Sequence, residues 1–469
     1  MSGSSSIRLG RWLRNGFPVL GLALLAMAEL ASLIGRNFGT IAGWLVFALP
    51  AGALLGYVGI RLLAHARFSK CVSSAGVALD NHRDRDALQI ADEAIALAAK
   101  WKFRPDDAVA MAFVIRAEAL RRSGSKQEAL EAAARGFSCM CGVRRGGTQL
   151  VLFDQLGTLL LESGHARRAI PILEAAVGLG HRASAKPLET AGRLERAGLA
   201  CFRVGVHANA AASFGKAIDL MTKERGADAV ELASPYINLG NCYKRMQKLD
   251  DAERCYREAL RLQRLGKSEN TEQLSIILLN LGVACAESGR DPEAEDFYRQ
   301  VLDLRTQTLG RNHWRVGNVY NNLACCRRRM RDLNGAEEYV QRALNILEDH
   351  PEQLSNAVES LSRIREDQGR MEEALAATTR AREIQQNLPT PDLSEMATFY
   401  DREALLASRC GDEDRAKDCR ARAAETRQAL AAAPPADRDL TNLPESLRAL
   451  EQHLASSLDH VRSLEQAVS

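Results

Sequence analysis

Aromatic residues are scarce in this chain of 469 residues, because Phe, Trp and Tyr together make up only 5%. Strands favour aromatic and β-branched side chains, whereas the abundant Ala, Leu, Arg and Glu favour helices. The chain is also too long for one ordinary compact core, so we expect several domains or a repeat array. These features together predict an all-α protein.

The sequence has little excess charge of either sign, with a formal net charge of +3. Proteins that bind nucleic acid normally carry a concentrated basic surface. Here the only dense basic cluster of the body is Arg327, Arg328 and Arg329 with Arg331, and no aromatic residues interleave it for base stacking. We therefore expect no nucleic-acid partner.

Motifs of common catalytic sites are also missing. The sequence has no P-loop, no GxSxG, no HExxH and no Gly-rich dinucleotide turn, and its nine histidines are scattered. No segment outside the repeats described below is large enough for a catalytic fold. We predict that the protein is not an enzyme, with no catalytic residues and no cofactor.

The eleven cysteines lack the spacing of a metal site or of a disulfide framework. Their number is odd, and the only close pairs are Cys139 with Cys141 and Cys325 with Cys326, neither of which is a CxxC. Most cysteines fall where small buried side chains sit in helices. We predict free thiols, no metal and a reducing compartment.

Two long apolar runs stand near the N-terminus, at 17–35 and 41–64, after a basic segment at 1–16. Each is long enough to cover most of the ~30 Å hydrocarbon core of a bilayer as a helix. Basic residues flank the pair on both outer sides, and only Arg36 lies between the runs, which places both ends in the cytoplasm. We predict a multi-pass membrane protein with a transmembrane hairpin over 17–64, in a bacterial inner membrane. A cleaved signal peptide, or one span with an interfacial helix, is the alternative.

Two features inside the predicted hairpin suggest further roles. Glu29 is an intramembrane carboxylate, which is a functional hypothesis by default, although it can also be protonated or lie near the headgroups. Gly52 and Gly56 form a GxxxG, which permits close helix packing within the hairpin or between two copies.

From about residue 68 to 430 the chain repeats one unit about nine times. A key alanine recurs at steps of 38 to 42 residues, at Ala87, Ala129, Ala169, Ala210, Ala252, Ala294, Ala336, Ala374 and Ala416. In the clearest copy, Leu239, Gly240 and Tyr243 share one face of a first helix. Ala252, Tyr256 and Ala259 follow on a second helix, where the outer alanines permit close approach of the first.

A glycine falls at the same place in the turn of most units, where a left-handed residue is expected to end the first helix. These glycines are Gly124, Gly164, Gly205, Gly289, Gly369 and Gly411. One helix pair cannot bury its apolar faces alone, so neighbouring pairs must stack to complete the core.

This pattern resembles the tetratricopeptide repeat, and the 42-residue period with the string at 309–347 resembles its kinesin-light-chain subtype. The resemblance implies a right-handed α-solenoid of helix pairs, here preceded by two transmembrane helices. It implies no transport of motor cargo, since the predicted hairpin departs from kinesin light chains and the proline that ends the general repeat is largely missing.

The C-terminal part comprises a Pro/Ala-rich linker at 431–440 and an amphipathic helix at 441–469, with a leucine or valine every three or four residues. We interpret this helix as a cap on the last repeat. A homodimer through it is the alternative, because its apolar seam covers about three heptads.

In stacked repeats of this family the first helices line the concave groove, and asparagines beside the Leu-Gly pair contact bound peptides. The resemblance therefore places Asn238, Asn241, Asn280, Asn321 and Asn322 in a groove. Their amides can pair with any peptide backbone. Cations further along the same helices suit an acidic group in the ligand, namely Lys244, Arg245, Arg328 and Arg329. Bridges between repeats and a solvated basic face are the alternative interpretation.

We thus predict a membrane-anchored scaffold or adaptor that binds a peptide or protein partner in its groove. A structural or assembly subunit of a membrane complex, acting through the hairpin, is the second hypothesis.

Overall fold

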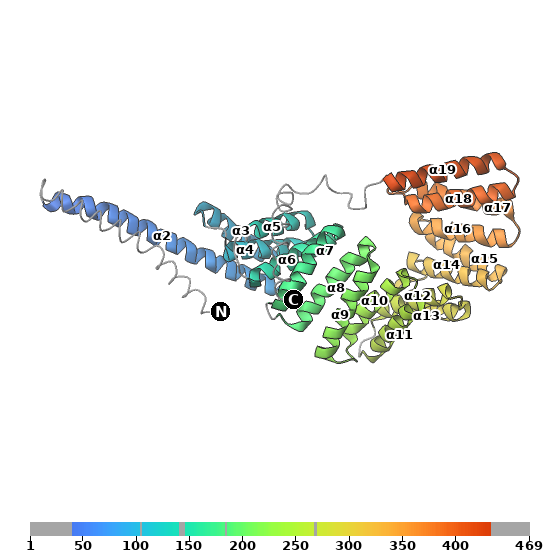
Figure 1. The fold of residues 1–469 in the computed structure, drawn as a ribbon, viewed down its shortest axis with the longest axis horizontal. Coiled ribbons are helices and arrows are strands. Elements are labelled where there is room, and N and C mark those ends of the chain that lie inside the picture. Colours follow the sequence, from blue (N-terminus) through green and yellow to red (C-terminus); the bar gives the residue numbers. More distant parts are fainter. Residues whose placement is uncertain (1–39, 104–105, 140–145, 183–184, 267–269, 433–469) are drawn as a thin grey trace. The chain divides into compact units, whose positions relative to one another are not determined.

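The computed structural model describes residues 40–103, 106–139, 146–182, 185–266 and 270–432, and every regular element in these ranges is helical. The chain divides into two compact units, the first over residues 1–148 and the second over residues 149–469 (Figure 1). In each unit consecutive helices pair and neighbouring pairs stack. The predicted all-α class and its helix-pair repeats are therefore confirmed.

The first unit holds two helix pairs. Helices α2 and α3 form the first pair, α4 and α5 the second, and α3 also packs on α4. Their bounds are α2 Thr40–Asp80, α3 Asp84–Lys100, α4 Asp107–Arg122 and α5 Lys126–Cys139.

The second unit stacks its helices in chain order, each pair packing on the next. The first helices of the pairs are α6 Gly146–Glu162, α8 Pro187–Val204, α10 Ala233–Arg245, α12 Thr271–Glu287, α14 Trp314–Arg329, α16 Pro351–Asp367 and α18 Leu393–Arg409. The second helices are α7 Ala166–Arg182, α9 His207–Arg225, α11 Leu249–Leu265, α13 Asp291–Leu309, α15 Leu333–Leu347, α17 Met371–Gln386 and α19 Glu413–Ala432. A short 3-10 turn, Val230–Leu232, precedes α10.

In four pairs of the second unit a glycine of the first helix faces a larger residue sixteen positions later on the second helix. A Cβ on Gly240 would lie 2.6 Å from the Tyr256 ring, and one on Gly282 would lie 2.6 Å from the Tyr298 ring. The same spacing relates Gly157 to Leu173 and Gly198 to Phe214. The predicted notch and its filling side chain are therefore confirmed.

The pairs α14–α15 and α16–α17 have a larger residue in place of this glycine and a smaller one than tyrosine on the second helix. The buried residues Ala324 and Val340 occupy these positions in α14 and α15. In α16 and α17 they are Ser362 and Thr378, whose buried hydroxyls lie 2.7 Å apart. The Ser362 hydroxyl also donates to the Ala374 carbonyl at 2.8 Å, so the polar pair is satisfied.

All six predicted turn glycines have a positive φ, between +75° and +90°. The three remaining turns place an ordinary residue in the same left-handed conformation, namely His82, Gln247 and Arg331. Each of the nine left-handed residues lies five positions before a key alanine. The backbone of the turn is therefore uniform even where the sequence offers no glycine.

Helix α2 continues without interruption from Thr40 to Asp80, whereas the sequence suggested a division near residues 64–68. Of the predicted hairpin, the run at 17–35 with Glu29 lies outside the described residues. No helix in the described part of the chain is long and apolar enough to cross a membrane. The helix predicted at 441–469 also lies outside the described residues.

Candidate binding surface on the first helices

The first helices of neighbouring repeats contact one another, as α8 does with α10 and α14 with α16. No two second helices make contacts of comparable extent in the described part of the chain. The first helices therefore lie on the inner, more closely spaced side of the stack, as the resemblance implied.

Arginines cross-link the first helices at both ends of the second unit. Arg196 on α8 pairs with Asp154 on α6 at 2.5 Å. Arg402 on α18 pairs with Glu359 and Glu366 on α16, at 2.7 and 2.6 Å. These side chains are largely buried, so they connect each first helix to the next across the inner seam.

The same repeat position carries an asparagine in the three central repeats. Asn238, Asn280 and Asn322 stand two residues before the small residue of their helix, as Arg196 and Arg402 do in theirs. We call these three residues the amide row. Each is half-buried, and within the described ranges none of their side chains makes a hydrogen bond. At this position the amide row therefore offers amide donors and acceptors, whereas α8 and α18 carry ion-paired arginines there.

Two further predicted asparagines behave differently from the amide row. Asn241 accepts a hydrogen bond from the Tyr256 hydroxyl at 2.7 Å, so its carbonyl oxygen is committed within its own repeat. Asn321 lies beside Asn322 on α14, and its carbonyl oxygen is buried without a hydrogen-bond partner.

The four predicted cations divide into two kinds. Arg328 pairs with Asp367 on α16 at 2.7 Å, and Arg329 pairs with Asp291 on α13 at 2.6 Å. Lys244 and Arg245, in the last turn of α10, have no ion pair among the described residues. Arg328 and Arg329 thus connect helices, whereas the other two remain available to a ligand.

Lys244 has an unusual environment for a lysine. It is half-buried, and this burial lowers the pKa of its ammonium group below the ordinary 10.5, although Glu287 on α12 partly opposes the effect. Arg245 is exposed beside it. Lys244 has no ion pair among the described residues, so an anionic group of a ligand would supply its counter-charge.

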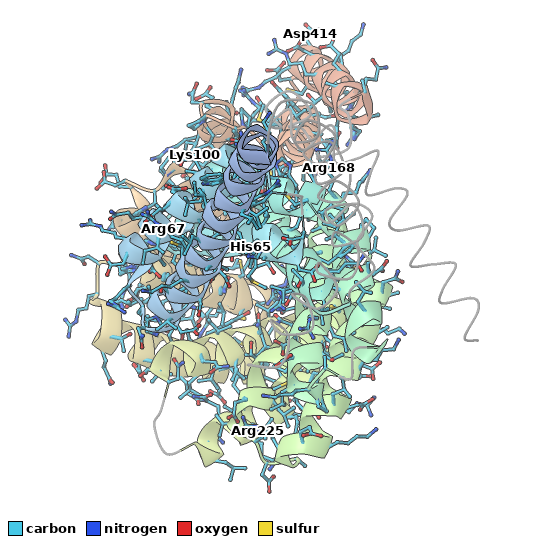
Figure 2. The ribbon with its side chains drawn as sticks, turned by 90° about the vertical axis from the view of Figure 1, so that its left-hand side faces the viewer. His65, Arg67, Lys100, Arg168, Arg225 and Asp414 are labelled. Atoms are coloured by element: carbon cyan, nitrogen blue, oxygen red, sulfur yellow. The ribbon has the colours of Figure 1, made fainter. Side chains whose placement is uncertain are left out.

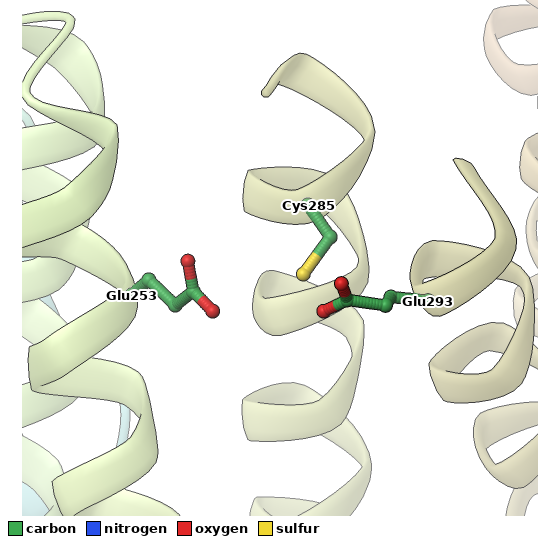
Figure 3. A group of neighbouring side chains, drawn as sticks. All are labelled: Glu253, Cys285 and Glu293. Atoms are coloured by element: carbon green, nitrogen blue, oxygen red, sulfur yellow. The ribbon is translucent and has the colours of Figure 1, made fainter. Parts of the chain in front are cut away.

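A second group of side chains has the composition of a metal site but is bridged by an arginine. Glu253, Cys285 and Glu293 bring their ligand atoms within 4.8 Å of one another (Figure 3). Arg290 pairs with both Glu253 and Glu293, and its hydrogen bonds lower the pKa of Glu253. Burial raises the pKa of the Cys285 thiol, which disfavours the thiolate that a metal requires. Arg290 therefore already supplies the positive charge that pairs with the two carboxylates of this cluster.

The ion pair between Glu253 and Arg290 is one of a series of ion pairs between neighbouring repeats. This series was not predicted from the sequence. Glu253, Glu295 and Glu337 each follow a key alanine, and they pair with Arg290, Arg327 and Arg365 of the next repeat. The 42-residue spacing of the glutamates was the available signal. No disulfide joins the ten cysteines of the described ranges, most of which are buried, while Cys410 is exposed.

Residues 190–264 and 273–349, which hold α8 to α15, match the tetratricopeptide repeat family. These helix pairs are therefore tetratricopeptide repeats, and the described chain is an all-α solenoid of that type. No curated protein sequence matches the chain.

Two of the matching solved structures share the fold at low sequence identity. The apo form of the quorum sensor NprR from B. thuringiensis is 14% identical, with a TM-score of 0.57 over 76% of this chain and 98% of that one. The apo form of RapI is 11% identical, with a TM-score of 0.58 over 78% of this chain and 98% of that one. A putative kinesin light chain from Podosopora anserina is 16% identical, with a TM-score of 0.38 over 42% of this chain and 94% of that one.

Proposed function

We propose that the protein is a membrane-anchored scaffold that binds an extended peptide, or an extended segment of a partner protein, along the amide row. The observation that carries this proposal is the change at one repeat position, from ion-paired arginine in α8 and α18 to unpartnered asparagine in α10, α12 and α14. Half-buried amides without partners gain most from a ligand that supplies backbone N–H and C=O groups.

The ligand should carry an acidic group at one end of this contact. Lys244 and Arg245 lie at the C-terminal end of α10, while Arg328 and Arg329 on α14 are already neutralised. The available positive charge is therefore concentrated beside one helix. A peptide that lies across three repeats is expected to place its carboxylate there.

The test uses full-length protein in detergent and a random library of short peptides. The tightest peptide is then titrated against a variant with Asn238, Asn280 and Asn322 changed to Ala. Each lost hydrogen bond costs about 0.5–1.5 kcal/mol, so binding should weaken at least about tenfold. The matched control changes Asn209, Gln300 and Gln341 to Ala, which removes three exposed amides of second helices.

Equal affinity in the amide-row variant and the control would refute the groove assignment, provided that both unfold at the wild-type temperature. Lys244→Met should lower the affinity for peptides that contain Asp or Glu, and should leave the affinity for neutral peptides unchanged. This second variant separates recognition of charge from recognition of the backbone.

Membrane anchoring through residues 17–64 rests on the two apolar runs and their flanking basic residues. We place the repeats in the cytoplasm of a bacterial cell, with the anchor in the inner membrane. Reporter fusions to the C-terminus, active only on one side of that membrane, test the orientation. Release of the full-length protein from membranes by alkaline carbonate would refute anchoring.

A further inference from the structure

The burial of apolar side chains on helix α2 changes at Ala64. From there to its end the buried residues form one stripe at helical spacing, namely Ala64, Phe68, Ala75 and Ala78. Phe68 packs with Ala94 of α3 and with Val109 and Ala112 of α4. This half of the helix is therefore an integral part of the first repeats.

Before Ala64 the same helix carries large apolar side chains that are exposed. Leu55, Tyr57, Ile60, Leu62 and Leu63 have 61%, 53%, 53%, 43% and 73% of their surface accessible. Figure 1 shows this part of α2 extending past the ends of α3 and α4 within the first unit. Exposed apolar surface of this extent is unusual for a helix that faces water.

These side chains spread over roughly 220° of the helix circumference and do not form one narrow stripe. At about 100° per residue, Leu55 and Tyr57 point in nearly opposite directions, and Ile60 and Leu63 fall between them. A protein partner or a second copy of the chain would cover one face of such a helix and leave the others in water. A lipid bilayer covers all faces at once, and a helix that is apolar over most of its circumference fits that environment.

The polar residues around the change in character suit a membrane surface. Arg61 is the only charged residue in the apolar run at 41–64, and its guanidinium donates to the Tyr57 hydroxyl at 3.4 Å. Arg67 and Lys70 follow on exposed positions, and Figure 2 labels His65 and Arg67 on this part of the helix. Arginine and tyrosine are typical of the boundary between hydrocarbon and headgroups.

We propose that residues 55–63 of α2 are embedded in a phospholipid bilayer, and that the bilayer surface lies between Leu63 and Phe68. Because Phe68 is already packed in the first repeat, the helix that enters the lipid is the helix that begins the solenoid, and no linker separates them. This inference rests on the membrane anchoring proposed above and is independent of the amide row.

The test reconstitutes full-length protein in vesicles of phosphatidylcholine and phosphatidylglycerol whose acyl chains are brominated. Single variants Leu55→Trp, Tyr57→Trp, Ile60→Trp and Leu63→Trp are compared with the unsubstituted protein, which corrects for native tryptophans. Bromine quenches tryptophan only at contact, so all four added signals should be quenched. The controls Ser69→Trp and Val77→Trp, at exposed positions of the same helix, should remain unquenched.

Quenching of Leu55→Trp without Tyr57→Trp, or the reverse, would mean that one face is covered by protein, and it would overturn the proposal. Quenching of Val77→Trp to the same degree would overturn the position of the boundary. Protein that fails to float with the vesicles would refute membrane anchoring and this inference together. Protein that floats with all four sites unquenched would refute this inference alone, and peptide binding is measured separately on the same samples.

Discussion

The ring of Tyr256 occupies the space beside Gly240, so that a Cβ at Gly240 would lie 2.6 Å from it. Gly282 and Tyr298 repeat this relationship one unit later. The contact determines how closely the two helices of a repeat approach, and it leads to the first prediction.

Gly240→Ala should destabilise the protein by about 1–3 kcal/mol, because the added methyl group overpacks a buried contact. Tyr256→Val in the same chain should recover part of this loss, since it recreates the Ala324 and Val340 pair of a later repeat. Recovery will be incomplete, because the hydrogen bond from Tyr256 to Asn241 is lost. Urea unfolding of the two single variants and the double variant gives the coupling energy. Simple additivity would contradict the role of the contact.

Gln247 adopts a φ of +59° in a turn that six other repeats end with glycine. A left-handed conformation costs a non-glycine residue about 1–2 kcal/mol, partly offset by the flexibility that glycine adds to the unfolded chain. Gln247→Gly should therefore raise the free energy of unfolding by up to about 1 kcal/mol. Gly289→Ala, at the equivalent turn with a φ of +75°, should lower it by a similar amount. The same sign for both substitutions would disprove the argument.

Glu359 and Glu403 should give stability opposite dependences on pH. Burial raises the pKa of Glu359 above 4.5, although Arg402 and Arg363 oppose the effect. Burial also opposes ionisation of Glu403, but hydrogen bonds from Arg415 and Arg382 bring the pKa of that carboxyl below 4.5. The native state therefore binds a proton at Glu359 more readily than the unfolded chain does, and at Glu403 less readily.

The stability of the wild type relative to Glu359→Gln should therefore fall as pH rises from about 4.5, because the ionised carboxylate is disfavoured in the fold. The stability relative to Glu403→Gln should be fully present above about 4.5 and should be lost as pH falls through the lowered pKa. Urea titrations of both variants from acid to neutral pH measure the two slopes. Parallel slopes would show that the two environments do not differ as described.

Lys244→Met and Arg328→Met should separate ligand binding from stability. Removing Arg328 leaves Asp367 with a weaker partner in a largely buried position, which should cost about 1–2 kcal/mol of stability and little affinity for peptide. Removing Lys244 relieves a desolvated charge that has no ion pair, so stability should hold or rise while affinity for acidic peptides falls. Calorimetric unfolding and peptide titration of both variants check this, and equal effects in both assays would contradict it.

The repeat architecture was determined by the sequence itself. Regular alanines, the notch at Leu239 and Gly240, and the six turn glycines are local signals, because helix periodicity and left-handed turns depend on neighbouring residues alone. The places where an expected residue is missing were not predictable in this way. Gln247 adopts the left-handed conformation because the packed helices on both sides impose it. The preference of glutamine itself does not predict this conformation.

Only part of the candidate site could be predicted from the sequence. The amide row could be located by its register, but the state of the cations depends on partners 38 to 39 residues away, such as Asp291 for Arg329 and Asp367 for Arg328. Whether a charge is paired or free is a property of the surfaces that stacking brings together, so only the tertiary structure decided that Lys244 and Arg245 remain available. The continuity of α2 from Thr40 to Asp80 was decided there as well, because the first repeat needs its C-terminal half to bury Phe68.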